Sequence, residues 1–187
     1  MRIAVSGTHF TGKSTLIEDF RLRYPHYKLE IEPYYQLQDE KTMELGLEPS
    51  LESILEQLDY SIDQLQQAVQ EKNVIFDRCP VDFLAYAMCH LNQNDVDMHD
   101  SEVSERLPDI KIALDRLDMI VFLPLSKENA LVYTEDNPAY RQAVDRCFKK
   151  IYRDDLYDIF PSYYHPRVIE LEGDRMTRLS ALENALG

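Results

Sequence analysis

A glycine-rich segment near the start of the chain has the spacing of a phosphate-binding loop. Residues 7–14 read Gly-Thr-His-Phe-Thr-Gly-Lys-Ser and match the Walker A pattern G-x-x-x-x-G-K-[ST]. Gly7 and Gly12 allow the backbone to curl so that its N–H groups can face phosphate oxygens. A helix starting near Lys13 would add the positive end of its dipole at the same place. This spacing predicts a site for the triphosphate of a nucleotide.

The Walker A pattern also predicts roles for individual side chains of the loop. Lys13 would reach the β- and γ-phosphates of ATP, and the Ser14 hydroxyl would be a ligand of Mg²⁺. The side chains of His9 and Phe10 are expected to pack within the loop. The residues expected to bind the nucleotide here are Gly7, Thr8, His9, Phe10, Thr11, Gly12, Lys13, Ser14 and Thr15.

A second candidate site lies at the end of another apolar run. Residues 74–76 are Val-Ile-Phe, and Asp77 and Arg78 follow directly. An acid at the carboxyl end of a buried strand can complete a magnesium site with Ser14, and Arg78 would bring a cation to the same crevice. The alternative is an exposed Asp–Arg pair that merely ends a strand.

The elements that must position these residues alternate along the chain. Apolar runs predict strands over residues 2–6, 27–32, 73–77, 119–123 and 168–171. Helices are expected over residues 13–24 and 51–69, and another helix should begin at Pro80. A separate helix should follow the loop at residues 92–101 and end at about residue 117, and a last one should begin at Pro138. Alternation of this kind predicts an α/β, three-layer P-loop NTPase fold around a five-stranded parallel sheet. We expect one domain over residues 1–187, with a helical acceptor-side region at about 34–72 and a lid at about 124–141.

Composition excludes several classes of function. The net charge is −14, from 34 acidic and 20 basic residues, so a polymeric nucleic acid would be repelled. No apolar run approaches the length of a membrane span, and the first strand leaves no room for a signal peptide. The three cysteines are too widely spaced for a disulfide framework, which favours a reducing cytoplasm. The Asn-Lys-x-Asp and Asp-x-x-Gly motifs of GTPases are missing from the sequence.

The chain resembles the P-loop kinases of nucleosides and nucleoside monophosphates. It is most similar to the ATPase/kinase-like domains related to nicotinamide riboside kinase, and more distantly to deoxynucleoside kinases. The matching residues are Gly7 to Thr15, Glu32-Pro33, Asp77-Arg78, Pro80, Asp82, Phe83, Tyr140-Arg141 and Gly173-Asp174.

The resemblance implies roles for several of these residues. Glu32 would be the general base that accepts the proton of the attacking hydroxyl, while Glu30 could replace it only in a different strand register. Asp77 would contact the metal or the acceptor, and Arg78 the phosphate. Arg141 would neutralise charge in the lid, and Gly173 would lie beside adenine. The segment 124–138 departs from the family, because Lys127 is its only cation.

Two further sets of residues have alternative interpretations. Asp82 could support the site from behind, although a charge that favours the start of a helix is the preferred interpretation. Tyr34 and Tyr35 could stack on a planar acceptor, and Gln57 and Gln64 could bind its polar edge. Ordinary helix surface or core is the alternative for these four residues.

We therefore expect an ATP-dependent, Mg²⁺-dependent kinase that acts on a small, nucleoside-like hydroxyl compound. Its catalytic residues would be Lys13, Glu32, Asp77, Arg78 and Arg141, with Ser14 and Asp77 at the metal. The alternative is an ATP-binding and ATP-hydrolysing regulator that acts on a protein partner, which the cation-poor lid favours. The sequence leaves a homodimer open and does not identify the acceptor.

Overall fold

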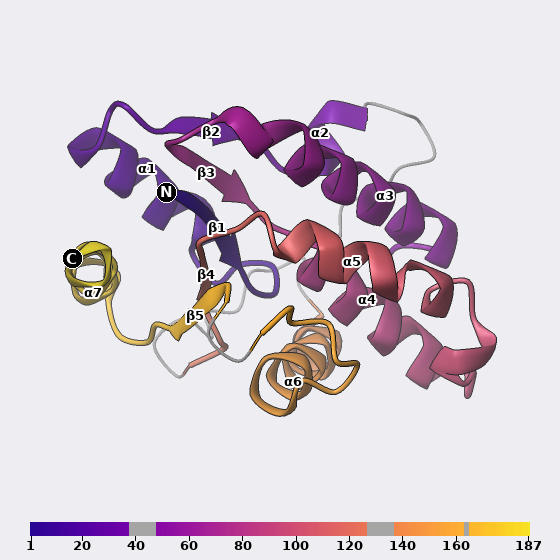
Figure 1. The fold of residues 1–187 in the computed structure, drawn as a ribbon. Helices are drawn as coiled ribbons and strands as arrows, with labels where there is room; N and C mark the ends of the chain where they lie inside the picture. Colours follow the sequence, from indigo (N-terminus) through magenta and orange to yellow (C-terminus); the bar gives the residue numbers. More distant parts are fainter. Residues whose placement is uncertain (38–47, 127–136, 163–164) are drawn as a thin grey trace.

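Five short strands form a parallel sheet in the order β2-β3-β1-β4-β5 (Figure 1). The computed structural model describes residues 1–37, 48–126, 137–162 and 165–187. The strands are β1 (Arg2–Ser6), β2 (Lys28–Glu30), β3 (Val74–Asp77), β4 (Met119–Phe122) and β5 (Arg167–Glu170). β1 and β4 are buried almost throughout, as expected for central strands that are covered on both faces.

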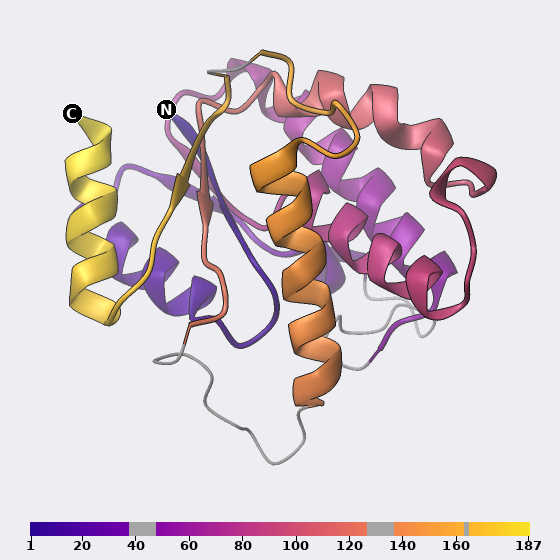
Figure 2. The same ribbon diagram turned by 90° about the horizontal axis from the view of Figure 1, so that it is seen from below.

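Helices cover both faces of this sheet. They are α1 (Lys13–Arg23), α2 (Pro33–Leu37), α3 (Leu51–Gln67), α4 (Pro80–Gln93), α5 (Leu107–Leu114), α6 (Pro138–Asp154) and α7 (Arg175–Leu186). The described part of the chain also contains the 3₁₀ turns η2 (Ala68–Gln70), η3 (Met98–Asp100) and η4 (Ser104–Arg106). α1 and α7 lie on one face, and α3 to α6 lie on the other (Figures 1 and 2). The predicted three-layer α/β fold with five parallel strands is thus confirmed.

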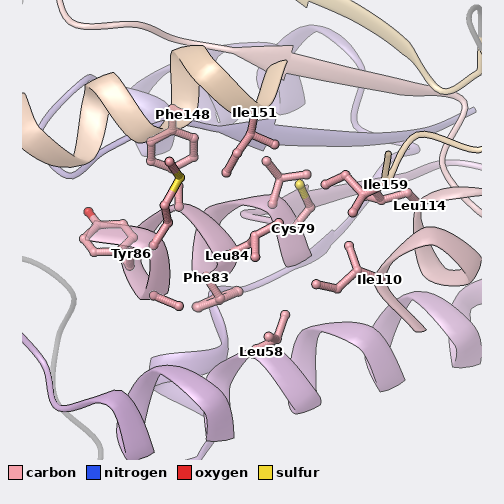
Figure 3. Close-up of a cluster of buried hydrophobic side chains, with 14 of the residues drawn as sticks. Leu58, Cys79, Phe83, Leu84, Tyr86, Ile110, Leu114, Phe148, Ile151 and Ile159 are labelled. Atoms are coloured by element: carbon pink, nitrogen blue, oxygen red, sulfur yellow. The ribbon is translucent and has the colours of Figure 1, made fainter. Parts of the chain in front are cut away.

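Each face of the sheet has its own hydrophobic core. The smaller core joins α1 and α7 to the sheet through residues such as Phe20 and Leu182. The larger core packs α3, α4, α5 and α6 together, and Figure 3 shows Leu58, Phe83, Ile110 and Phe148 among its buried side chains. The larger core fixes the start of α4, which lies directly after β3.

The second strand is shorter than the sequence predicts. The expected strand over residues 27–32 is reduced to β2 (Lys28–Glu30), and Pro33 begins helix α2. Proline ends a strand and also fits the first turn of a helix, so the same residue allows both outcomes. Glu32 consequently lies in the turn between β2 and α2.

Two other expectations concern the lid and the membrane. Most of the predicted lid, including Lys127, lies outside the described residues, while Arg141 lies within α6. No helix in the described part of the chain is long and apolar enough to cross a membrane.

Replacing Leu58 tests the larger core. Leu58 is completely buried between α3 and its neighbours, so Leu58→Ala should lower the free energy of unfolding by about 3 kcal/mol. Leu22→Ala on α1 is the matched control, because Leu22 is 81% exposed and its loss should change stability by less than about 0.5 kcal/mol. Urea unfolding followed by circular dichroism measures both, and equal effects would contradict the packing.

Candidate active site

The glycine-rich loop turns directly after β1, at the carboxyl edge of the sheet. A Cβ atom on Gly7 would lie 2.5 Å from the carbonyl oxygen of Leu123, and the φ angle of Gly7 is +144°. Only glycine therefore allows the loop to pass so close to the end of β4. Gly12 has a φ angle of +88° and precedes the first residue of α1.

Inside the loop, two side chains converge on one carbonyl group. Lys13 Nζ donates to the carbonyl oxygen of Thr8 at 2.9 Å, and Thr11 Oγ1 donates to the same oxygen at 3.0 Å. Burial, followed by the Arg78 cation, lowers the pKa of Lys13 from 10.5 to about 8, although Asp77 and Glu32 oppose this. The loop thus holds a desolvated lysine that an anion would stabilise in its charged form.

The start of α1 provides hydrogen-bond donors to the same region. The first backbone bond of the helix runs from the amide of Leu16 to the carbonyl oxygen of Gly12, at 3.0 Å. No side chain caps the helix, so within the described residues the amides of residues 12–15 have no acceptor. Four such amides beside Lys13 suit a phosphate group, because both the donors and the helix dipole favour negative charge.

Asp77 lies at the end of β3, next to Val5 of β1, and faces Ser14. Ser14 Oγ donates to Asp77 Oδ2 at 3.5 Å. Asp77 Oδ1 is buried and has no hydrogen-bond partner among the described residues. Burial raises the pKa of Asp77, while Lys13 and Arg78 lower it. A carboxylate with one unpaired oxygen beside a serine hydroxyl fits Mg²⁺, which prefers oxygen ligands.

Arg78 joins the ends of β2 and β3 to the loop. Its Nε donates to Glu32 Oε1 at 2.5 Å, and its Nη1 donates to the carbonyl oxygen of Gly7 at 3.2 Å. Burial alone would lower its pKa, but Glu32, Tyr86 and Asp82 hold the pKa above its usual value. Arg78 is only 5% exposed, so the alternative of an exposed Asp–Arg pair is wrong.

Asp82 anchors the glycine-rich loop through buried hydrogen bonds, a role that the preferred interpretation of the sequence did not include. It is completely buried in the first turn of α4. Its Oδ1 accepts from the amide of Gly7 at 3.1 Å and from Arg78 Nη1 at 3.3 Å, while Oδ2 accepts from the amide of Cys79 at 3.1 Å. Asp82 caps its helix as expected, and it also anchors Gly7. The spacing of four residues between Arg78 and Asp82 was the feature of the sequence that could have predicted this ion pair.

Two more supports of the loop come from distant elements and were not predicted. The hydroxyl oxygen of Tyr86 on α4 accepts from the amide of His9 at 3.0 Å and lies 2.9 Å from His9 Nδ1. Arg178 on α7 donates from Nη1 to the carbonyl oxygen of Thr11 at 2.7 Å. Helices on both faces of the sheet therefore hold the loop. The burial of His9 agrees with its expected packing role, whereas Phe10 is 45% exposed.

The remaining residues that the sequence predicted for the site differ in how deeply they are buried around the glycine-rich loop. Arg141 is buried in the first turn of α6, next to Tyr140, whose ring stacks on His9 with centroids 6.2 Å apart. Gly173 lies in the turn between β5 and α7, and α7 reaches the loop through Arg178. Phe10 and Thr15 are exposed on the loop and on α1.

The candidate acceptor residues are divided between surface and core. Tyr35 is 55% exposed and packs edge-on against Tyr34, with ring centroids 5.1 Å apart. Gln57 is completely buried and donates to the carbonyl oxygen of Ser53, one turn earlier in α3. Gln64 donates to Glu30 and to the carbonyl oxygen of Ile31. Both glutamines therefore bond within the protein, and a role for them in binding an acceptor stays a prediction.

The sequence and the fold were compared with known proteins. A family model described as AAA domain (AAA_28) matches residues 2–173. None of the curated proteins matches the sequence. Among solved structures, deoxyadenosine kinase from M. mycoides with bound dATP is 23% identical, has a TM-score of 0.69, and is covered over 99% of its length by 100% of this chain.

A second solved structure with the same fold is thymidylate kinase from Candida albicans. It is 18% identical, with a TM-score of 0.64, and the match covers 99% of this chain and 90% of that one. The deoxyadenosine kinase was also solved with products dCMP and dCDP bound, at 21% identity and a TM-score of 0.67, with 100% of this chain and 98% of that chain covered. The predicted resemblance to the fold of P-loop nucleoside and nucleotide kinases is confirmed.

Replacing Asp82 tests the anchor of the loop. Asp82→Asn keeps the shape but removes the buried charge that faces Arg78, so we expect the free energy of unfolding to fall by about 3 kcal/mol. Asp59→Asn is the matched control, since it breaks a solvent-exposed ion pair with Arg106 that should contribute less than about 1 kcal/mol. Urea unfolding compares the two variants, and an Asp82→Asn effect as small as the control would refute the anchoring role.

Proposed function

The chain belongs to the AAA domain family (AAA_28), and from this premise we propose that it is a small-molecule kinase. It transfers the γ-phosphoryl group of ATP to a hydroxyl group of a nucleoside-like compound. The observation that carries the proposal is the grouping of Lys13, Asp77, Arg78 and Glu32 at one edge of the sheet. The pKa of Lys13 responds to the other three, after burial, so their charges act on one region.

In this proposal the loop binds the triphosphate of ATP. Lys13 and the amides of residues 12–15 contact its phosphate oxygens, because these donors have a strong preference for an anion. Ser14 and Asp77 hold Mg²⁺, whose charge, when it is bound, would offset the negative charge of the phosphates. Gly173 lies in the turn before α7, whose Arg178 contacts the loop, and we assign this turn to the adenine side of the site.

Glu32 is the proposed general base. Arg78 binds one oxygen of the Glu32 carboxylate, and the Glu32 side chain is 13% exposed. The carboxylate is therefore oriented but still accessible to an acceptor. Glu32 would position the acceptor hydroxyl and accept its proton as the oxygen attacks the phosphorus atom. Arg78 and Arg141 would stabilise negative charge on the transferred group. Glu30 is a weaker candidate, because Lys28 Nζ binds it at 2.6 Å and Gln64 contacts its other oxygen.

The proposed acceptor class rests on the fold and on local charge. The similar structures are a deoxyadenosine kinase and a thymidylate kinase. Carboxylates at Glu30 and Glu32 border the expected acceptor side, which favours a neutral or cationic acceptor over one that already carries a phosphate group. A nucleoside or a related riboside fits both considerations.

Nucleotide binding should take up protons near pH 8. In the protein without nucleotide, the pKa of Lys13 is about 8, and bound phosphates should raise it. Nucleotide binding at pH 8 should therefore take up as much as about half a proton. At pH 6.5 Lys13 is already charged, and the uptake should be close to zero. Above pH 8 the affinity for ATP should fall as the pH rises, because protonating Lys13 then costs free energy.

Calorimetric titration in buffers with different heats of ionisation measures this uptake. Lys13→Arg is the control, since arginine stays charged and should abolish the difference between pH 6.5 and pH 8. If the wild-type protein takes up equal numbers of protons at both pH values, Lys13 is not the group that binds the phosphates.

Replacing Glu32 tests the transfer step. Glu32→Gln should lower kcat by about 100-fold or more while the affinity for ATP changes little, because glutamine can still accept a hydrogen bond from Arg78 but cannot accept the proton. Glu30→Gln, two residues away, is the matched control and should keep most of the turnover. ADP release is measured with a panel of nucleosides and ribosides, and the phosphorylated product is identified by mass spectrometry.

The same panel separates the two functions that the sequence left open. A kinase releases ADP faster when its acceptor is present, and phosphate appears on that acceptor. If no nucleoside or riboside stimulates ADP release, the proposal fails and a regulatory ATPase becomes the better account. If stimulation occurs but Glu32→Gln keeps full turnover, the kinase survives and Glu32 is not its base.

A further inference from the structure

Two of the three cysteines meet between α4 and α6, away from the proposed transfer chemistry. Cys89 lies near the end of α4 and Cys147 lies in the middle of α6, and both are free thiols. Both side chains line one surface cavity of about 270 Å³. Their exposed fractions are 2% and 5%, so in the described part of the chain this cavity is the route by which a reagent can reach them.

The cavity is positively charged although the protein as a whole is acidic. Arg146 and Lys150 of α6 line it together with Asn92 and Gln93 of α4. Among the described residues no acidic side chain lines the cavity, although the charge of Glu48 acts on Cys89 from outside it. Local cations of this kind raise the concentration of small anions and their rate of encounter.

The two thiols are not equivalent. The neighbouring Cys147 thiol lowers the pKa of Cys89, burial opposes this, Arg146 lowers the pKa further and Glu48 raises it. The neighbouring Cys89 thiol, together with burial, raises the pKa of Cys147. Cys89 is therefore the better nucleophile, and Cys147 retains its proton until a later step. Burial raises the pKa of the third cysteine, Cys79, which leaves that thiol unreactive.

A metal site does not explain the pair. Among the residues that the structure describes, no group of three or more histidine, cysteine or acidic side chains could hold a metal ion. Two thiols beside two cations suit an anionic electrophile better than a metal cation. Small disulfides that carry carboxylates, of which oxidised glutathione is an example, have this chemistry.

We propose that Cys89 and Cys147 are a redox-active dithiol that reacts with a small anionic disulfide of the glutathione type. The Cys89 thiolate attacks one sulfur of that disulfide, forms a mixed disulfide and releases one thiolate. Cys147 then loses its proton and attacks the Cys89 sulfur, which closes the protein disulfide and releases the second thiol. The protein dithiol is oxidised and one small disulfide is reduced to two thiols, so atoms and electrons balance.

The position of the cross-link gives the reaction a structural consequence. It would tie α4, whose Asp82 and Tyr86 anchor the glycine-rich loop, to α6, whose first turn carries Tyr140 and Arg141. This reaction does not depend on kinase activity, so its test and the test of the proposed function can fail separately.

The reaction can be measured on the wild-type protein. The reduced, folded chain is incubated with oxidised glutathione, the excess is removed, and free thiols are counted in denaturant. We expect two of the three thiols to disappear, with a mass loss of two hydrogen atoms and a Cys89–Cys147 cross-linked peptide. Retention of all three thiols, or a disulfide that includes Cys79, would overturn the proposal.

Variants separate the two steps and the role of charge. Cys147→Ser should stop at one glutathione on Cys89, and Cys89→Ser should leave Cys147 unmodified over the same period. Replacing Arg146 and Lys150 together by glutamine should raise the pKa of Cys89 and slow both reagents, but oxidation by glutathione disulfide should slow about tenfold more than oxidation by the uncharged 2-hydroxyethyl disulfide.

Lys149→Gln is the matched charge control. Lys149 lies on the same helix but pairs with Asp145 and does not line the cavity, so its replacement should leave the rate unchanged. Equal slowing by Lys149→Gln would show that net charge, and not the cavity, directs the reagent. Modification of Cys147 in preference to Cys89 would refute the proposed order of attack.

Discussion

The buried contact between Asp82, Gly7 and Arg78 is the interaction on which the rest of the site depends. Asp82 accepts from the Gly7 amide and from Arg78, and Arg78 in turn holds Glu32 and the Gly7 carbonyl oxygen. One carboxylate at the start of α4 therefore fixes the glycine-rich loop and, through Arg78, the end of β2. A phosphate site needs this support from outside, because its own amides must stay without acceptors.

The charges of the site are arranged so that a phosphate group would complete them. Lys13 is desolvated and its pKa is low, while one oxygen of Asp77 is buried without a partner among the described residues. Burying the Lys13 charge and leaving the Asp77 oxygen unpaired both cost free energy in the protein without ligand. Phosphate oxygens beside Lys13 and Mg²⁺ beside Asp77 would remove both costs, so ligand binding and stability should be coupled.

Local signals in the sequence predicted much of this arrangement. The glycine spacing and the apolar runs located the loop and the strand ends, including Asp77, because both signals depend on neighbouring residues only. The role of Asp82 was underestimated, since an aspartate in the first turn of a helix looks the same in sequence whether solvent or Arg78 faces it. The contact of Arg178 with Thr11 was not predictable, because it joins opposite ends of the chain. Strand β2 came out shorter because Pro33 suits a helix start as well as a strand end.

The most direct measurement is a crystal structure of the protein with Mg²⁺ and a non-hydrolysable ATP analogue. The account predicts that the β- and γ-phosphates lie on the amides of residues 12–15 and on Lys13, with the metal between Ser14 and Asp77. It also predicts that the γ-phosphate faces Glu32 across the end of β3. A nucleotide bound elsewhere, or phosphates directed away from Lys13, would contradict it.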